Sequence, residues 1–235
     1  MNERNQKVQD AASFYVQQIL NIDYHQADFV YRSIRPYFKG NTALELGPAS
    51  GYMTKSLVND FQTLHLIEGS KSLIDQIPDY PNVTKHCSMF EEFESNMQFD
   101  TIIMSHVLEH IEKPLEVLNK IKYWLKDDGI FIISVPNAKS LHRIVAVKMG
   151  LLESEYTLNQ RDLALGHYRV YDLQTLSIDI TNSGFKVIKS GGSFLKPLSN
   201  AQIEEYWTNE MVEGFFELGK QFPENCAEIF IICSK

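Results

Sequence analysis

The order of hydrophobic and polar positions divides the chain into a helical N-terminal stretch and a longer alternating part. In the first forty residues apolar side chains recur at roughly helical spacing, as Val16, Ile19 and Leu20 do. After residue 40, short β-rich runs alternate with helical patterns. Five such runs lie at 42–46, 63–68, 83–87, 99–105 and 129–136. This order of elements predicts a parallel sheet with right-handed crossovers.

The clearest helical pattern lies between the fourth and fifth β-rich runs, from Pro114 to just before Gly129. Pro114 suits the first turn of a helix, Leu118 and Ile121 lie on one face, and Gly129 suits the position just past the end. The two flanking runs are almost uniformly apolar. Such runs are typical of strands that are buried on both faces of a sheet.

The C-terminal third predicts a helix over 172–183, with Asp172 as its N-cap and Gly184 just beyond it. Two strand-like runs at 185–190 and 227–235 then bracket a helical insert around 201–220. We therefore predict an α/β fold with a mostly parallel seven-stranded sheet and one antiparallel edge strand. The whole chain forms one domain in this prediction. Its parts are a helical cap (1–40), a core (41–137) and two acceptor-side insertions (138–172 and 192–224).

Composition and charge narrow the function classes. The net charge is −8, from 22 Lys and Arg against 30 Asp and Glu. This excess of acid argues against a generic nucleic-acid surface, which needs clustered basic side chains. No apolar run approaches the length that spans a bilayer, and the N-terminus lacks the apolar region of a signal peptide. Together with three widely spaced cysteines, these features predict a cytoplasmic protein without a membrane or nucleic-acid partner.

A glycine-containing loop, ALELGPASGY at 43–52, follows the first predicted strand. Its spacing, E-x-G-x-x-x-G, differs from the dinucleotide motif G-x-G-x-x-G. Gly47 permits a close approach of the backbone to a ligand, and Gly51 permits the next helix to begin close to the strand. Glu68 ends the following strand, where a carboxylate is placed to accept two hydrogen bonds from a ribose. With Glu45, these positions predict a nucleoside site at the strand tips.

The segments LELGPASGYMTKSL, LHLIEGS and the run from Phe99 to Asn137 resemble the successive motifs of class I S-adenosylmethionine-dependent methyltransferases. The resemblance covers residues 40 to 137 in the right order and spacing. It implies a three-layer Rossmann-like fold and S-adenosylmethionine as the cofactor. By this resemblance the glycine loop lies under the methionine part, Glu45 fixes that loop and Glu68 binds the ribose.

The same resemblance assigns two further pairs of residues. Ser88 and Met89 face the adenine, and Ser105 and His106, just past the fourth strand, line the methionine end and the acceptor's entrance. No metal is predicted, because the segment MSHVLEH lacks the set of acids and an amide found in catechol-type relatives. His106 and His110 have the i, i+4 spacing of metal ligands, but they would need a third ligand nearby.

Methyl transfer from a sulfonium needs a base only when the acceptor is weakly acidic. The candidates for a base are His106, His110 and His167, and the alternative for His110 is a packing or turn-capping role. The stretch 140–172 is expected to bind the acceptor. Between 139 and 171 there are five Lys or Arg against three acids. The candidate acceptor ligands are His142, Arg143, His167, Tyr168 and Arg169.

Within this stretch, Arg143 and Arg169 suit a bidentate site for phosphate or carboxylate, or else the stretch is a solvated lid. We expect transfer of a methyl group to an oxygen or nitrogen of a small anionic or sugar-bearing metabolite, with surface-polysaccharide synthesis as one setting. The alternatives are a quinone-like lipid precursor as acceptor, a non-catalytic cofactor-binding regulatory subunit, and a nicotinamide oxidoreductase. The aromatic side chains of 201–220 suit burial within the monomer or a homodimer contact.

Overall fold

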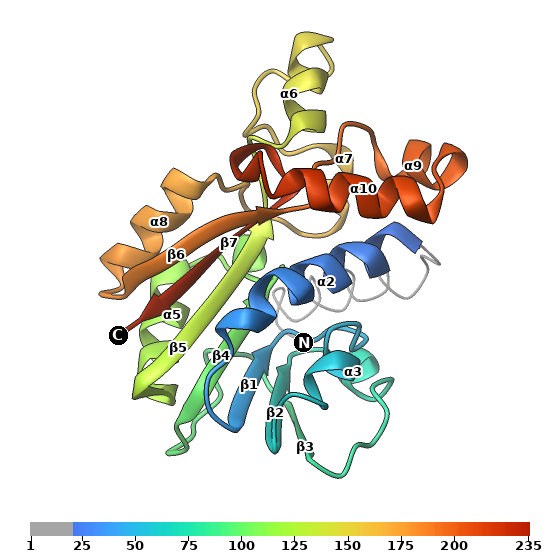
Figure 1. Ribbon diagram of the computed structural model, residues 1–235. Helices are drawn as coiled ribbons and strands as arrows, with labels where there is room; N and C mark the ends of the chain where they lie inside the picture. The colour runs from blue at the N-terminus through green and yellow to red at the C-terminus, as the bar shows by residue number, and fades with distance from the viewer. Residues whose placement is uncertain (1–20) are drawn as a thin grey trace.

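The seven strands form one sheet in the order β3-β2-β1-β4-β5-β7-β6 (Figure 1). The structure is a computed structural model that describes residues 21–235, so the first half of the predicted helical cap, with Val16, Ile19 and Leu20, lies outside the described residues. The strands are β1 (Thr42–Leu46), β2 (Thr63–Glu68), β3 (Val83–Cys87), β4 (Phe99–Ser105), β5 (Leu125–Pro136), β6 (Lys186–Ser193) and β7 (Glu228–Ser234).

The pairing of these strands confirms the predicted Rossmann-like class. The pairs β1–β2, β2–β3, β1–β4 and β4–β5 are all parallel. Strand β7 runs antiparallel to both β5 and β6 and lies one place in from the edge. The chain builds outward from β1 in one direction and from β4 in the other. Ligands in open α/β sheets bind at such a reversal, beyond the carboxyl ends of the strands.

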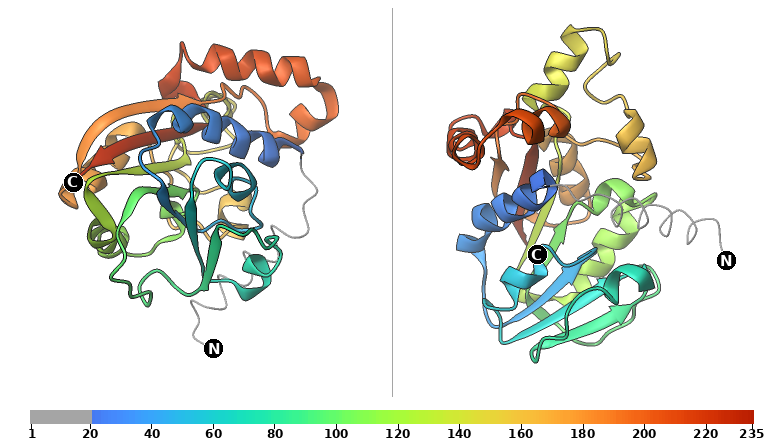
Figure 2. Two further views of the ribbon diagram at one scale, coloured as in Figure 1. Left: turned by 60° about the horizontal axis from the view of Figure 1, so that its bottom comes forward. Right: turned by 90° about the vertical axis from the view of Figure 1, so that its right-hand side faces the viewer.

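Helices cover both faces of the sheet, so its central strands are apolar on both sides (Figures 1 and 2). One face packs against α5 (Pro114–Trp124) and α8 (Leu173–Asn182). The other packs against α2 (Asn21–Ile34), α3 (Thr54–Leu57) and α4 (Lys71–Ile74). Residues 21–235 also contain three 3₁₀ turns, η1 (Arg35–Tyr37), η2 (Leu108–His110) and η3 (Pro223–Asn225).

Helix α5 is shorter than its sequence pattern predicts. It ends at Trp124, and Leu125 already pairs with Phe99 as the first residue of β5. Gly129 therefore lies inside a strand, beside a shift in the β4–β5 register. A Cβ at Gly129 would lie 3.0 Å from the carbonyl oxygen of Phe99. The glycine serves this close approach of two strands, and sheet pairing overrides the helical periodicity of residues 125–128.

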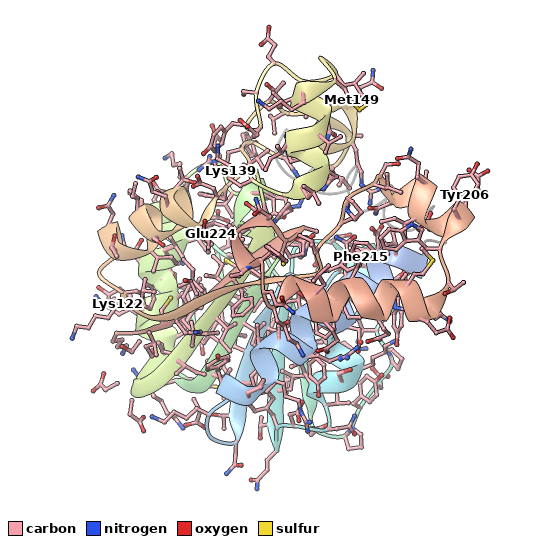
Figure 3. The ribbon with its side chains drawn as sticks, turned by 45° about the horizontal axis from the view of Figure 1, so that its top comes forward. Lys122, Lys139, Met149, Tyr206, Phe215 and Glu224 are labelled. Atoms are coloured by element: carbon pink, nitrogen blue, oxygen red, sulfur yellow. The ribbon has the colours of Figure 1, made fainter. Side chains whose placement is uncertain are left out.

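Two groups of helices stand beyond the carboxyl ends of the central strands (Figures 1 and 2). The predicted insertion after β5 carries α6 (Leu141–Lys148) and α7 (Gln160–Ala164). The insertion between β6 and β7 carries α9 (Asn200–Tyr206) and α10 (Asn209–Gly219). Figure 3 shows Met149 at the outer end of α6 and Tyr206 at the end of α9, both directed away from the sheet.

Helix α10 packs on α2 through aromatic rings. Phe216 stacks on Phe29 with ring centroids 4.4 Å apart, and Arg32 of α2 forms an ion pair with Glu213 of α10 at 2.8 Å. Phe216 is thus buried within the monomer, whereas Tyr206 is exposed. Among residues 21–235, no helix combines the length and apolar character needed to cross a membrane.

Candidate functional site

A cleft of about 1030 Å³ opens at the carboxyl ends of the central strands, between the sheet and the helical insertions. This volume lies at the upper end of the roughly 300–1000 Å³ of single-ligand pockets, so it has room for two small molecules. The cleft brings together most of the residues singled out in the sequence, namely Glu45, Gly47, Glu68, Ser88, Met89, Ser105, His106, His110, His142, Arg143, His167 and Tyr168. Gly51 and Arg169 are not among its lining residues.

The glycine loop after β1 brings bare backbone to the cleft. Gly47 has φ +66°, and its N–H donates to the carbonyl of Ile67 at 2.8 Å, which joins the loop to β2. A Cβ at this position would lie 2.4 Å from Cγ2 of Val107. Both the backbone angle and this contact require glycine. Gly51, with φ +82°, closes the turn by donating to Pro48 O at 2.8 Å, so it shapes the loop from outside the cleft.

Glu45 is buried at the end of β1 and ties this strand to α3. Its Oε2 accepts a hydrogen bond from Thr54 Oγ1 at 2.7 Å, at the first residue of the helix. Burial, with a smaller contribution from the neighbouring Glu68, raises the pKa of Glu45 to about 7 despite the hydrogen bond from Thr54. The contact agrees with a carboxyl group that fixes the geometry of the glycine loop.

Glu68 connects the tip of β2 to the same loop. Its Oε2 accepts from the N–H of Ala49 at 3.2 Å, and its Oε1 accepts from the N–H of Ser70 at 2.8 Å. Burial raises the pKa of Glu68 despite these donors. The backbone of Gly69 is a third donor to this carboxylate. An ionised carboxylate has about four acceptor positions, so about one remains for a ligand in the cleft.

The tip of β3 supplies the next part of the cleft wall. Ser88 N–H donates to Glu68 O at 3.0 Å, and Ser88 Oγ donates to the carbonyl of Met89 at 3.0 Å. Together with Leu73 and Phe90, Met89 gives this wall an apolar surface. Such a surface suits the flat face of a purine.

His106 lines the cleft just past the carboxyl end of β4. We call the part of the cleft beside Gly47, Glu68 and Met89 the cofactor end, and the part beside His110, His167 and Lys196 the acceptor end. Its φ is +55°, its N–H donates to Ser134 O at 2.9 Å, and its side chain is 32% exposed. Ring Nε2 lies 3.1 Å from Oε2 of Glu228, the first residue of β7. Glu228 is buried, and its Oε1 accepts from Gln26 Nε2 at 2.7 Å. Oε2 of Glu228 has no hydrogen-bond partner among the described residues, so its contact with the His106 ring is one of proximity and charge.

The sequence reasoning missed Glu228, although a signal was present. Glu228 is the single acid in the otherwise apolar run AEIFIIC, just as Glu45 is in TALEL. An acid at a strand end within an apolar run indicates a candidate functional site, because burial of a carboxylate costs free energy that its surroundings must offset. Its partner Gln26, on α2, carries no comparable signal in the sequence.

His110 and His167 line the acceptor end of the cleft and contact each other. Their rings are edge-to-face with centroids 4.6 Å apart. Burial lowers the pKa of His110 to about 3, so the ring is neutral at pH 7. His110 lies in η2, which is the short helical turn expected from the sequence. Tyr168, the neighbour of His167, lines the cleft and donates its N–H to Glu109 O at 2.8 Å.

The two arginines expected to form an anion site have other partners. Arg143 is buried and donates to Asp162 Oδ2 at 3.0 Å and to the carbonyls of Glu155 and Thr157. Its guanidinium therefore holds together residues 143–162 of the insertion after β5 (138–172), and we call this insertion the lid. Arg169 donates to the carbonyl of Glu112 at 2.8 Å. The structure does not place these arginines together in the cleft.

A lysine that the sequence reasoning overlooked lines the cleft together with Arg143 and Arg161. Lys196 lines the cleft, is buried, and donates from Nζ to Asn200 Oδ1 at 2.7 Å. Burial lowers its pKa to about 8. His142 is half-buried beside it, and desolvation and nearby cations lower its pKa to about 2. In sequence, Lys196 is one of many lysines, and only the fold makes it distinctive.

Comparison with known proteins agrees with this geometry. A family model described as a methyltransferase domain matches residues 23–190. Malonyl-[acyl-carrier protein] O-methyltransferase of Halalkalibacterium halodurans is 21% identical over 132 residues, which cover 49% of each chain. Ubiquinone biosynthesis O-methyltransferase of Rickettsia bellii is 26% identical over 139 residues, 56% of each chain. The chain thus spans about half the length of the curated relatives it matches.

Solved structures show the same fold at low identity. N-methyltransferase NodS from Bradyrhizobium japonicum, in complex with S-adenosyl-l-homocysteine, superposes with a TM-score of 0.62 at 11% identity. The superposition covers 99% of this chain and 98% of that one. The family model covers well over half of the sequence, and the sheet order and glycine loop fit it. The chain belongs to the methyltransferase-domain family.

Proposed function

We propose that this enzyme transfers the methyl group of S-adenosylmethionine to a hydroxyl oxygen of a small anionic or sugar-bearing metabolite. The observation that carries this proposal is that Nε2 of His106, in the wall of the cleft, lies 3.1 Å from the buried carboxylate oxygen Oε2 of Glu228. A hydroxyl is weakly acidic and needs a base to become a good nucleophile, whereas a neutral amine does not. A histidine paired with a buried carboxylate is the arrangement that supplies such a base.

The cofactor end has the features that S-adenosylmethionine requires. The loop at Gly47 offers a surface without a side chain for the methionine part, and Glu68 retains about one acceptor position for a ribose hydroxyl. Ser88 and Met89 border the place of the adenine. When bound, the cofactor supplies an electrophilic methyl group on a sulfonium. The protein's part is to align the acceptor with that methyl group and to keep water out.

In the acceptor end, the side chains of the protein bind the substrate and take up its proton. His106 receives the proton of the acceptor hydroxyl as the oxygen becomes methylated, and Glu228 stabilises the resulting imidazolium. Lys196 attracts a carboxylate or phosphate on the acceptor in place of the arginines predicted from the sequence. A cation inside a largely dry cleft gives an anionic ligand more binding energy than it would at the surface.

A second class of acceptor has support from the lid. Leu151 and Leu163 line the cleft although they are 69% and 61% exposed, which gives its mouth an apolar rim. Such a rim suits a phenol or quinone-like lipid precursor, and one relative is named for ubiquinone biosynthesis. Lys196 would then hold a carboxylate or phenolate on the ring of that acceptor.

Radiolabelled methyl transfer tests the proposal. Purified enzyme is incubated with tritiated S-adenosylmethionine and separate pools of phosphorylated sugars, hydroxy acids and carboxylated phenols. We expect one pool to become labelled. His106→Asn should then reduce turnover by roughly 10²–10⁴-fold while S-adenosylhomocysteine binding is kept. His86→Ala, on β3 and not itself a lining residue, is the matched control.

Two outcomes would contradict the proposal. Tight cofactor binding with no labelled product from any pool would favour a regulatory subunit. Full turnover by the His106→Asn variant would remove the base and favour an amine acceptor. Lys196→Met separates the two acceptor classes. It should raise the Michaelis constant for an anionic acceptor at an unchanged cofactor affinity, and it should have little effect on an uncharged phenol.

A further inference from the structure

Three side chains of the metal-ligand type converge at the acceptor end of the cleft. Glu109 and His110 belong to η2, and His167 follows α7. A carboxylate oxygen of Glu109 and one ring nitrogen of each histidine all lie within 4.8 Å of one another. Within residues 21–235 this is the group of His, Cys, Asp and Glu side chains whose geometry would hold a metal ion.

The carboxylate of Glu109 lacks the partners that its burial demands. Its side chain is 1% exposed, and neither oxygen has a hydrogen-bond partner among the described residues. The nearest basic nitrogen, Nδ1 of His106, is 3.8 Å away, too far for a hydrogen bond. A buried carboxyl group without partners is costly, and it needs either a proton or a cation. Burial accordingly raises the pKa of Glu109 to about 7.

Both histidines have one ring nitrogen anchored, which leaves the other for a ligand. Nδ1 of His167 lies 3.4 Å from Oδ1 of Asp162, and Asp162 is itself held by Arg143 at 3.0 Å. The ring of His110 hydrogen-bonds to the carbonyl of Leu165. Metal-binding histidines almost always have this arrangement, with a carboxylate or carbonyl fixing the ring and its tautomer.

We propose that Glu109, His110 and His167 form a site for a divalent transition metal at the acceptor end of the cleft. Two imidazoles and one carboxylate are the ligand set of catalytic zinc sites and of non-haem iron sites. Such sites leave at least one coordination position open. His110 and His167 line the cleft, so the open position faces the space that the acceptor would occupy.

This site differs from the pair that the sequence spacing indicates. His106 and His110 have the i, i+4 spacing, but Nε2 of His106 faces Glu228. The partners of His110 in the proposed site are instead Glu109 and His167. For substrate recognition, which rests on the proposed function, the open position selects acceptors with a coordinating oxygen beside the hydroxyl that is methylated.

Cobalt binding tests the site independently of catalysis. The whole protein is stripped with a chelator and then titrated with Co²⁺, whose visible absorption reports nitrogen and oxygen ligation. We expect saturation at one equivalent, followed by displacement with Zn²⁺. Glu109→Gln and His167→Ala should each weaken binding by more than about 100-fold, beyond the effect of losing an outer partner. His86→Ala removes one member of the hydrogen-bonded pair His65–His86 and serves as the control.

S-adenosylhomocysteine binding, measured on every variant, distinguishes a lost ligand from a lost fold. Should His167→Ala fail to bind it, Glu109→Gln, which keeps the shape of the side chain, decides the question. The inference is overturned if wild type shows no saturable Co²⁺ absorption, or if Glu109→Gln binds Co²⁺ as tightly as wild type. Metal binding without methyl transfer would instead count against the proposed function and leave the site standing.

Discussion

Replacement of Glu68 by alanine tests the cofactor end most directly. Three of the roughly four acceptor positions of this carboxylate are occupied by backbone N–H groups, those of Ala49, Gly69 and Ser70, which leaves about one for a ribose hydroxyl. A hydrogen bond to a charged acceptor contributes about 1.5–3 kcal/mol. We therefore expect a total loss of about 1.5–3 kcal/mol, which is roughly 10- to 150-fold in Kd.

Isothermal titration with S-adenosylhomocysteine measures this loss. Glu68→Gln keeps one acceptor oxygen, so its Kd should lie between those of wild type and Glu68→Ala. Glu116→Ala is the control, because it removes the same charge from an exposed position on α5, where Glu116 pairs only with Lys113 at 3.0 Å. Thermal unfolding of each variant shows whether the loop after β1 has remained intact.

A single result would refute the ribose assignment. If Glu68→Ala folds and binds S-adenosylhomocysteine within twofold of wild type, the carboxylate does not hold the ribose. Its hydrogen bonds to Ala49, Gly69 and Ser70 would then be its whole role. A loss equal to that of Glu116→Ala would lead to the same conclusion, since it would reflect net charge alone.

Three further substitutions test the packing and electrostatics of the site. Gly47→Ala should destabilise the protein by about 1–3 kcal/mol in urea unfolding, because of its positive φ and the contact with Val107; an unchanged midpoint would contradict this. The pKa of Glu45 is raised from 4.5 to about 7, so the folded state binds more protons and stability falls as pH rises between these values. Glu45→Gln should therefore be more stable than wild type above pH 7, by on the order of 3 kcal/mol, with little gain at pH 4.5; equal gains at both would be inconsistent with the raised pKa. Asp162→Asn leaves the buried Arg143 without its carboxylate partner and should lower the free energy of unfolding by about 3–5 kcal/mol. A loss below about 1 kcal/mol in urea unfolding would mean that the pair is solvated.

The lid shows how far charge counts along the sequence can mislead. The basic residues of 139–171 suggested an anion site made by Arg143 and Arg169. The fold instead buries Arg143 against Asp162, an acid of the same stretch, and directs Arg169 to a backbone carbonyl. Opposite charges that are distant in sequence cancel locally when the chain folds back on itself. Lys196, from a different insertion, also lines the cleft, as does Arg161, which pairs with Asp23 at 2.9 Å.

The central strands were predictable from the sequence because each of them coincides with a short apolar run, whereas β3 and β6 are more polar. The bounds of β1 to β4 match the runs at 42–46, 63–68, 83–87 and 99–105. The glycine loop was predictable for a similar reason, since the backbone at Gly47 adopts an angle that only glycine adopts without strain. Where local periodicity competed with pairing, at residues 125–128, the sheet prevailed and α5 ended early.

Local pattern determined the element types, the sheet class and the cofactor loop of this methyltransferase, because backbone preference and burial act over a few neighbouring residues. Only the tertiary structure decided which side chains meet in the cleft. His106 meets Glu228 because β7 is inserted beside β5, and Glu109 meets His167 because the lid folds back over η2. Such contacts depend on the crossovers between distant elements, and no short stretch of sequence encodes them.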